Sequence, residues 1–245
     1  MSISFDERFE VLKRLHGEEG VAKLRASQAV VIGVGGVGSW AAEAICRSGI
    51  ERIRLIDMDT VAASNTNRQS EAVDGAYGRP KAQVLAERFH TINPDASVEV
   101  LQVRVTTDNV SQMIPEGAVI LECVDDVDAK AAIVAQAKKK GNVVIVSGGA
   151  GGRTDPTQIR LADLTQVAGD ALLSKLRYTL RKRFGFPAGS MKRSKPFGVL
   201  AAFSPEPMRQ GPGGVFGTSM AVTAAMGMAV ASAAIRAALE KGAEK

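Results

Sequence analysis

A short apolar strand that runs into a glycine-rich turn is the most constraining feature of this sequence. Residues 29–33 (AVVIG) are continuously apolar and rich in β-branched side chains, and a helical segment follows over 38–48. The glycines of the turn are Gly33, Gly35, Gly36 and Gly38. Such a turn lets the backbone approach phosphate groups, while the helix N-terminus presents unpaired N–H groups to anions. The segment therefore predicts nucleotide binding.

The pattern downstream alternates strands with helices. Strands are expected at 29–33, 52–57, 98–105, 118–123 and 143–147, and helices at 38–48, 80–92 and 128–140. This alternation predicts an α/β fold with a doubly wound (Rossmann-like), mostly parallel sheet.

The pattern changes after residue 147. A short strand near 158–162, a basic helix over 171–184, a Gly-, Pro- and Ser-rich loop over 185–214 and an apolar terminal helix are expected there. We therefore expect a nucleotide-binding domain over residues 1–150 and a C-terminal extension over 151–245.

Polar residues after the second strand distinguish between two cofactors. Asp57 lies at the strand end, 19 residues after Gly38, where a carboxylate binds ribose in both NAD and ATP sites. Further polar residues follow at Asp59, Asn65, Arg68 and Lys81. A dehydrogenase has no need of this cluster, whereas Arg68 and Lys81 can neutralise phosphate charge as pyrophosphate leaves. The cluster favours ATP.

Carboxylates also follow the fourth strand, in residues 122–126 (ECVDD). This is the ligand-binding edge of a parallel sheet, and oxygen ligands suit Mg²⁺. Asp125 is the candidate ligand. Cys123 is interpreted as a packing residue, with a nucleophile as the alternative. Trp40 is interpreted as a packing residue, with base stacking as the alternative. Lys130 either approaches the nucleotide or begins a solvated helix.

Cysteine content and hydropathy restrict the class of protein. The cysteines are Cys46 and Cys123, without a CxxC pair, which excludes a disulfide framework and a four-cysteine zinc site. A reducing cytoplasm is expected. Residues 216–235 carry no charge, but their many small side chains favour a buried helix over stable membrane insertion.

Positive charge is concentrated in one segment. The chain has a formal net charge of +5, and residues 171–205 contain basic side chains but no acidic ones. The basic residues are Lys175, Arg177, Arg181, Lys182, Arg183, Lys192, Arg193 and Lys195. The segment suggests a polyanionic partner, with a solvated loop as the alternative.

The motifs GxGGxGS, DxDxVxxSNxxRQ and GxPK resemble those of the ubiquitin-activating-enzyme-like superfamily, the MoeB/ThiF/HesA group. The resemblance implies adenylation of a carboxylate by ATP. It assigns ATP contacts to Gly35, Gly36 and Gly38, ribose to Asp57, phosphates to Asn65, Arg68 and Lys81, and Mg²⁺ to Asp125. The group also lends an N-terminal arginine to a partner subunit, which implies a homodimer. Arg14 is the first choice and Arg8 the second.

Segments 36–44, 65–69, 145–159 and 203–206 are similar to the tRNA threonylcarbamoyladenosine dehydratase branch of this group. That branch adenylates the threonyl carboxylate of a modified adenosine in tRNA, after which the neighbouring carbamoyl group closes a ring and AMP leaves. No cysteine follows Cys123, so thioester transfer is not expected. The alternatives are activation of a ubiquitin-like or sulfur-carrier protein C-terminus, and a non-catalytic scaffold with a sulfur-relay protein partner.

Overall fold

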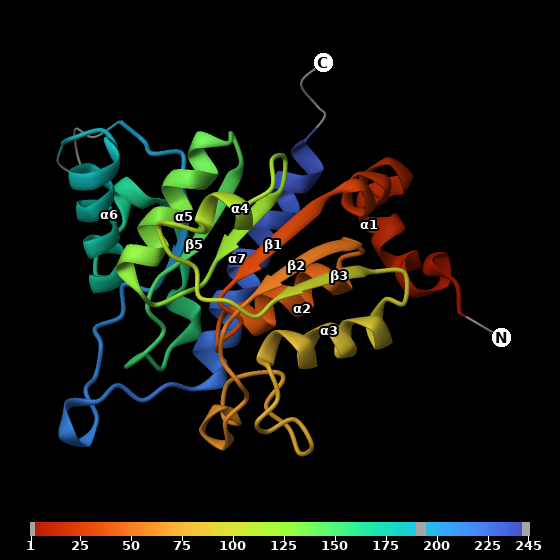
Figure 1. Cartoon of the computed structure of the whole chain (residues 1–245), viewed down its shortest axis with the longest axis horizontal. Coiled ribbons are helices and arrows are strands. Elements are labelled where there is room, and N and C mark those ends of the chain that lie inside the picture. Colours follow the sequence, from red (N-terminus) through yellow and green to blue (C-terminus); the bar gives the residue numbers. More distant parts are fainter. Residues whose placement is uncertain (1–2, 190–194, 242–245) are drawn as a thin grey trace.

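The computed structural model describes residues 3–189 and 195–241, and its centre is a seven-stranded sheet in the order β3-β2-β1-β4-β5-β7-β6 (Figure 1). The strands are β1 (Gln28–Ile32), β2 (Arg52–Ile56), β3 (Ser97–Leu101), β4 (Val119–Glu122), β5 (Val143–Ser147), β6 (Arg160–Asp163) and β7 (Leu200–Phe203). Neighbouring strands are parallel except β6 and β7, which pair antiparallel. The predicted α/β, doubly wound class is confirmed.

Helices cover both faces of this sheet (Figure 1). They are α1 (Phe5–Ala26), α2 (Gly38–Arg47), α3 (Lys81–Ile92), α4 (Val110–Met113), α5 (Val127–Lys139), α6 (Ala171–Phe184) and α7 (Met220–Glu240). Because side chains alternate along a strand, β1 serves two cores. Val31 packs in the core that contains α2 and α7 residues, whereas Val30 and Ile32 pack in the core that contains α5 and α6 residues.

The terminal helix α7 packs closely on α2. A Cβ atom at Gly227 would lie 2.5 Å from the Val37 carbonyl oxygen, so only glycine permits this approach. Among the described residues, α7 is the one helix long and apolar enough to cross a membrane, but half of its most apolar window is buried in the protein. Its small side chains therefore serve close helix packing here.

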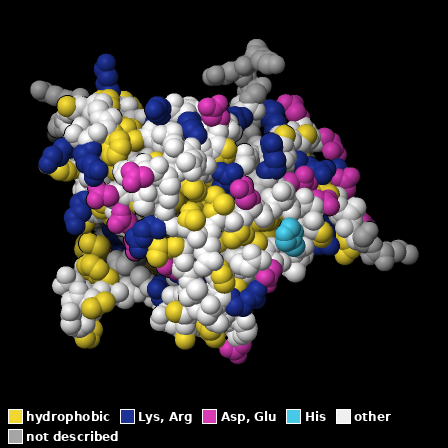
Figure 2. Space-filling view, viewed as in Figure 1, with side chains coloured by type: hydrophobic (Ala, Val, Ile, Leu, Met, Phe, Trp, Pro, Cys, Tyr) yellow, Lys and Arg dark blue, Asp and Glu magenta, His cyan; other side chains and the backbone are white. Residues whose placement is uncertain are grey.

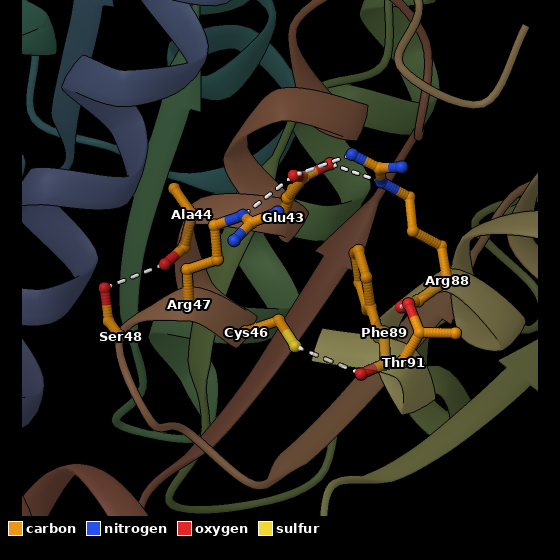
Figure 3. A network of polar contacts seen from close by, with 8 residues as sticks. All are labelled: Glu43, Ala44, Cys46, Arg47, Ser48, Arg88, Phe89 and Thr91. Atoms are coloured by element: carbon orange, nitrogen blue, oxygen red, sulfur yellow. Dashed lines mark hydrogen bonds and ion pairs between the residues drawn. The ribbon is translucent and has the colours of Figure 1, made fainter. Parts of the chain in front are cut away.

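A charged cluster joins α2 to α3 (Figure 3). The Glu43 carboxylate accepts hydrogen bonds from Arg47 Nε at 2.8 Å and from Arg88 Nε at 2.8 Å. Burial disfavours the charged carboxylate, but Arg88 and Arg47 outweigh this effect and hold the pKa of Glu43 below its ordinary value. Beside them, Cys46 is buried and its thiol faces the Phe89 carbonyl oxygen at 3.8 Å.

Several elements differ from the sequence-based expectations. Helix α1 was not expected, and β3 ends at Leu101 instead of residue 105 because its partner β2 ends at Ile56, the residue that pairs with Leu101. Strand β7 lies inside the segment expected to be loop. It pairs in parallel with β5, a long-range partner that local sequence does not reveal. Helix α7 begins at Met220, four residues after the expected start.

Candidate nucleotide-binding site

A cavity of about 840 Å³ lies at the carboxyl ends of the central strands. Residues that follow β1, β2, β3, β4 and β5 line this cavity. From the sequence-predicted set, its lining includes Gly33, Gly35, Gly36, Asp57, Asp59, Asn65, Arg68, Lys81 and Asp125. The residues expected to bind one ligand thus line one cavity.

The glycine turn between β1 and α2 is shaped by two close approaches. Gly33 has a φ of +82°, and a Cβ atom there would lie 2.9 Å from the Cys123 carbonyl carbon. A Cβ atom at Gly38 would lie 1.8 Å from the Gly33 carbonyl oxygen. Gly38 is buried and absent from the cavity lining, so it shapes the turn, whereas Gly35 and Gly36 face the cavity.

Asp57 is fixed at the end of β2. Its Oδ2 accepts a hydrogen bond from the Val34 backbone N–H at 2.7 Å, and its Oδ1 accepts one from the Asp59 N–H at 2.8 Å. Each carboxylate oxygen has more than one lone pair, so both can accept further hydrogen bonds from hydroxyl groups in the cavity. This arrangement suits a ribose.

Two cations, Lys81 and Arg68, line the cavity. Lys81 is buried and forms an ion pair with the more exposed Asp59 at 3.1 Å. Arg68 donates from Nη1 to the Ser64 carbonyl oxygen at 2.9 Å and to Asn67 Oδ1 at 2.9 Å. Both side chains line the cavity, where they provide positive charge for an anionic ligand.

Two neighbouring polar side chains have structural partners. Trp40 donates from Nε1 to the Arg68 carbonyl oxygen at 2.9 Å, is partly buried and is absent from the cavity lining. It therefore holds the backbone of Arg68, while its packing between helix and sheet stays a prediction. Asn65 accepts from the Ala62 N–H at 2.9 Å through Oδ1, within the 3₁₀ turn Ala63–Asn65. Asn65 nevertheless lines the cavity.

The acidic residues after β4 divide into two roles. Asp126 is the N-cap of α5, because its side chain accepts a hydrogen bond from the Ala129 N–H at 2.8 Å. Asp125 is exposed and lines the cavity. Mg²⁺ in nucleotide sites is commonly held by one or two carboxylates together with phosphates and water, so Asp125 fits this ion. The described residues contain no group of three or more His, Cys, Asp or Glu side chains arranged for a metal.

A buried ion pair lies beneath these acids. Lys130 contacts Glu122, both side chains are completely buried, and Lys130 also donates to the Ser147 carbonyl oxygen at 3.0 Å. Glu122 accepts from the Val124 N–H at 2.9 Å. Neither interpretation of Lys130 from the sequence was right, because the side chain enters the interior and joins the ends of β4 and β5.

Cys123 lines the cavity but is a poor nucleophile. Burial raises the pKa of its thiol to about 12, and the nearby Glu122 carboxylate adds to the effect. Nucleophilic attack requires the thiolate. The packing interpretation of Cys123 is consistent with this environment.

Residues that the sequence patterns did not single out shape the β5 side of the cavity. Arg153 is completely buried, forms an ion pair with Asp170 at 3.3 Å, and donates to the Glu206 carbonyl oxygen at 3.2 Å. Asp170 also accepts from the Gly149 N–H at 3.0 Å. This network fixes the glycine turn after β5. A basic residue after a run of glycines was the available signal, but its acidic partner lies 17 positions along the chain.

The two arginines considered for donation to a partner subunit lie away from the cavity lining. Arg14 is exposed on α1 and pairs with Glu10, and Arg8 lies beside a second, shallow groove. Helix α1 precedes β1 and lies at the amino end of that strand (Figure 1). Neither arginine therefore reaches the cavity of its own chain.

The basic segment lies on and after α6. Figure 2 shows basic side chains over this end of the molecule, with acidic ones among them. Arg183 lines the cavity and pairs with Asp128, and Arg177 donates to the carbonyl oxygens of Leu164 and Val167. The other described members are Lys175, Arg181, Lys182 and Lys195, while Lys192 and Arg193 lie outside the described residues.

The fold and the site together define a nucleotide-binding α/β protein with a parallel sheet and a glycine turn before its first crossover helix. The chain belongs to the ThiF family, which matches residues 8–245.

Similar proteins extend over most or all of the chain. The chain is 40% identical to the tRNA threonylcarbamoyladenosine dehydratase of Haemophilus influenzae over 84% of its own length and 78% of that protein. It is 38% identical to the corresponding Escherichia coli protein over 100% of this chain and 98% of that protein. A crystal structure of the E. coli dehydratase in complex with ATP has a TM-score of 0.92 and 40% identity, with 100% of both chains covered.

Proposed function

We propose that this protein uses ATP to dehydrate threonylcarbamoyladenosine in tRNA, by adenylating the threonyl carboxylate. The observation that carries the proposal is the single cavity that joins the glycine turn, Asp57, Arg68 and Lys81. The relatives with this function match most or all of the chain, and the relative with a near-identical fold was crystallised with ATP.

In the proposed reaction a threonyl carboxylate oxygen attacks the α-phosphorus of ATP, and pyrophosphate leaves. Gly35 and Gly36 admit the phosphates close to the backbone, and Asp57 accepts hydrogen bonds from the ribose. Arg68 and Lys81 neutralise the charge that develops on the phosphate oxygens. Asp125 would hold Mg²⁺, which would supply further electrostatic stabilisation.

In the second step the carbamoyl group of the same nucleoside attacks the activated acyl carbon and loses a proton. The former carboxylate oxygen leaves as part of AMP, so the net change in the nucleoside is the loss of one water. Nucleophile and electrophile belong to one molecule, which raises their effective concentration greatly. No protein nucleophile is needed, and the high pKa of the Cys123 thiol accords with this scheme.

The two parts of the chain have different roles in this proposal. Residues 1–150 carry most of the adenylation machinery, and residues 151–245 contribute the tRNA-binding cations of α6 and the segment after it. The active form is a homodimer in which Arg14, or Arg8 in its place, enters the partner's cavity. The protein acts in the cytoplasm without zinc, and a sulfur-relay protein is a further partner.

ATP–pyrophosphate exchange tests the proposed function. Exchange and AMP release are expected with tRNA that carries threonylcarbamoyladenosine, and neither is expected with the same tRNA lacking the modification. Exchange that depends instead on a carrier-protein C-terminus would favour the alternative of protein activation. If neither donor supports exchange over a range of salt concentrations, a non-catalytic scaffold is favoured.

A further inference from the structure

Phe216 is a large apolar side chain left partly exposed in the wall of the cavity. It is 42% exposed and belongs to the segment between β7 and α7. Covering such aromatic surface with a ligand is favourable, because it removes apolar area from water. None of the nucleotide-binding roles proposed above involves this ring.

The glycine turn after β5 is shaped to admit the ring. A Cβ atom at Gly152 would lie 2.9 Å from Phe216 Cδ1, and one at Gly151 would lie 3.1 Å from Phe216 Cβ. Any larger residue at these two positions would push the phenylalanine away. One side of the ring therefore lies against the glycine turn, while its exposed part borders the cavity.

The segment that carries the ring is attached at several points. The Gly152 N–H donates to the Gly217 carbonyl oxygen at 2.8 Å, and the Arg209 N–H donates to the Gly152 carbonyl oxygen at 2.7 Å. Asn67, which follows the second strand, donates from Nδ2 to the Thr218 carbonyl oxygen at 2.8 Å. These bonds hold Phe216 in a defined position without a ligand.

The strand order separates Phe216 from the expected position of the nucleotide. Asp57 follows β2 and residues 103–107 follow β3, so a ribose on Asp57 directs its base toward that side of the cavity. Phe216 lies against the turn after β5, on the other side of β1 and β4. At about 840 Å³ the cavity is near the upper end of the range of about 300–1,000 Å³ for ligand sites, which leaves room for a second reactant.

We propose that Phe216 is the stacking platform for the target adenine base, a specificity-determining contact that rests on the proposed function. A phenylalanine ring cannot neutralise a carboxylate or a phosphate, but its face suits a planar base. Recognition of single-stranded RNA commonly stacks unpaired bases on aromatic side chains. Stacking here orients the threonyl carboxylate of the same nucleoside toward the α-phosphate.

The test compares Phe216→Leu with Phe216→Tyr, using AMP release from ATP and tRNA that carries threonylcarbamoyladenosine. Leucine keeps apolar volume without a π face, whereas tyrosine keeps the aromatic ring. Phe216→Leu is expected to lower kcat/KM for the modified tRNA by about 5- to 150-fold, the range for loss of one stacked base. The KM for ATP is expected to stay within about twofold of wild type, and Phe216→Tyr is expected to retain most activity.

Val215→Ala is the matched control, because Val215 is 70% exposed on the same segment and does not line the cavity. It is expected to behave as wild type, and thermal melting checks that every variant is folded. The inference is overturned if Phe216→Leu matches wild type, if it changes chiefly the KM for ATP, or if leucine and tyrosine lower activity equally. If the wild-type protein itself releases no AMP with this tRNA, the proposed function fails instead.

Discussion

Arg68 is the residue whose removal tests the phosphate-binding side of the cavity. The Trp40 indole holds its backbone carbonyl, and its guanidinium lies at the cavity surface. Loss of one charge-stabilising donor in an active site costs about 100- to 1,000-fold in rate, so Arg68→Ala is expected to lower AMP release at least about 100-fold. Steady-state AMP release measures the effect.

Arg79→Ala is the control for Arg68, since Arg79 belongs to the same region but pairs with Glu87 and does not line the cavity. It is expected to keep near wild-type activity, and both variants are expected to retain native circular dichroism. Retention of full activity in Arg68→Ala would remove this residue from the mechanism.

Glu71 is a buried carboxyl group beside the nucleotide site. The residue is 1% exposed, and neither carboxylate oxygen has a hydrogen-bond partner among residues 3–189 and 195–241. Burial raises the pKa of Glu71 from about 4.5 to about 7, and the Asp57 charge contributes to the rise. Native Glu71 thus keeps its proton over a pH range in which the unfolded chain releases it.

Glu71→Gln is therefore expected to alter how stability depends on pH. Wild type loses stability relative to the variant as pH rises from about 4.5 to about 7, and the difference then stays constant at up to about 3 kcal/mol. Denaturant unfolding of both proteins near pH 4.5, 6 and 8 measures it. A difference that does not change with pH would show that Glu71 ionises normally in the native protein.

At the scale of elements, the Glu43 cluster joins α2, which follows the glycine turn, to α3, which begins with Lys81 (Figure 3). Glu43→Gln keeps the shape but removes the charge that both arginines contact. It is expected to lower the free energy of unfolding by roughly 1–3 kcal/mol at neutral pH. Because the pKa of Glu43 is lowered, this contribution is present above the ordinary glutamate pKa and is lost as pH falls through the lowered value. An equal effect at pH 7 and at strongly acid pH would contradict this account.

A helix or strand can be predicted from the sequence where its own residues carry the pattern, and not where its stability depends on distant segments. The apolar run at 29–33 and the basic helix over 171–184 carry their own patterns, and the structure has β1 and α6 there. Strand β7 is four residues long in a Gly- and Pro-rich segment, and its pairing with β5 and β6 stabilises it. The Arg153–Asp170 pair and the position of Phe216 likewise depend on contacts between distant segments.

At the level of the whole molecule, the proposed reaction requires a second copy of the chain. Arg14 is exposed on α1 and absent from the lining of the cavity in its own chain, so it can serve a cavity only across an interface. Mixing Arg14→Ala with Arg68→Ala subunits, each inactive alone, is expected to restore about a quarter of wild-type AMP release through hybrid dimers. The same mixture with Arg8→Ala in place of Arg14→Ala distinguishes the two candidates. No recovery with either arginine would contradict donation between subunits.

Isotope transfer tests most directly whether ATP activates the threonyl carboxylate of the modified tRNA. The tRNA is prepared with ¹⁸O in both oxygens of that carboxylate and incubated with the protein and ATP, and the products are analysed by mass spectrometry. The account predicts AMP that carries one ¹⁸O atom per cyclised nucleoside, with unlabelled pyrophosphate. Cyclisation with unlabelled AMP, or with ADP and labelled phosphate as products, would contradict adenylation of the carboxylate.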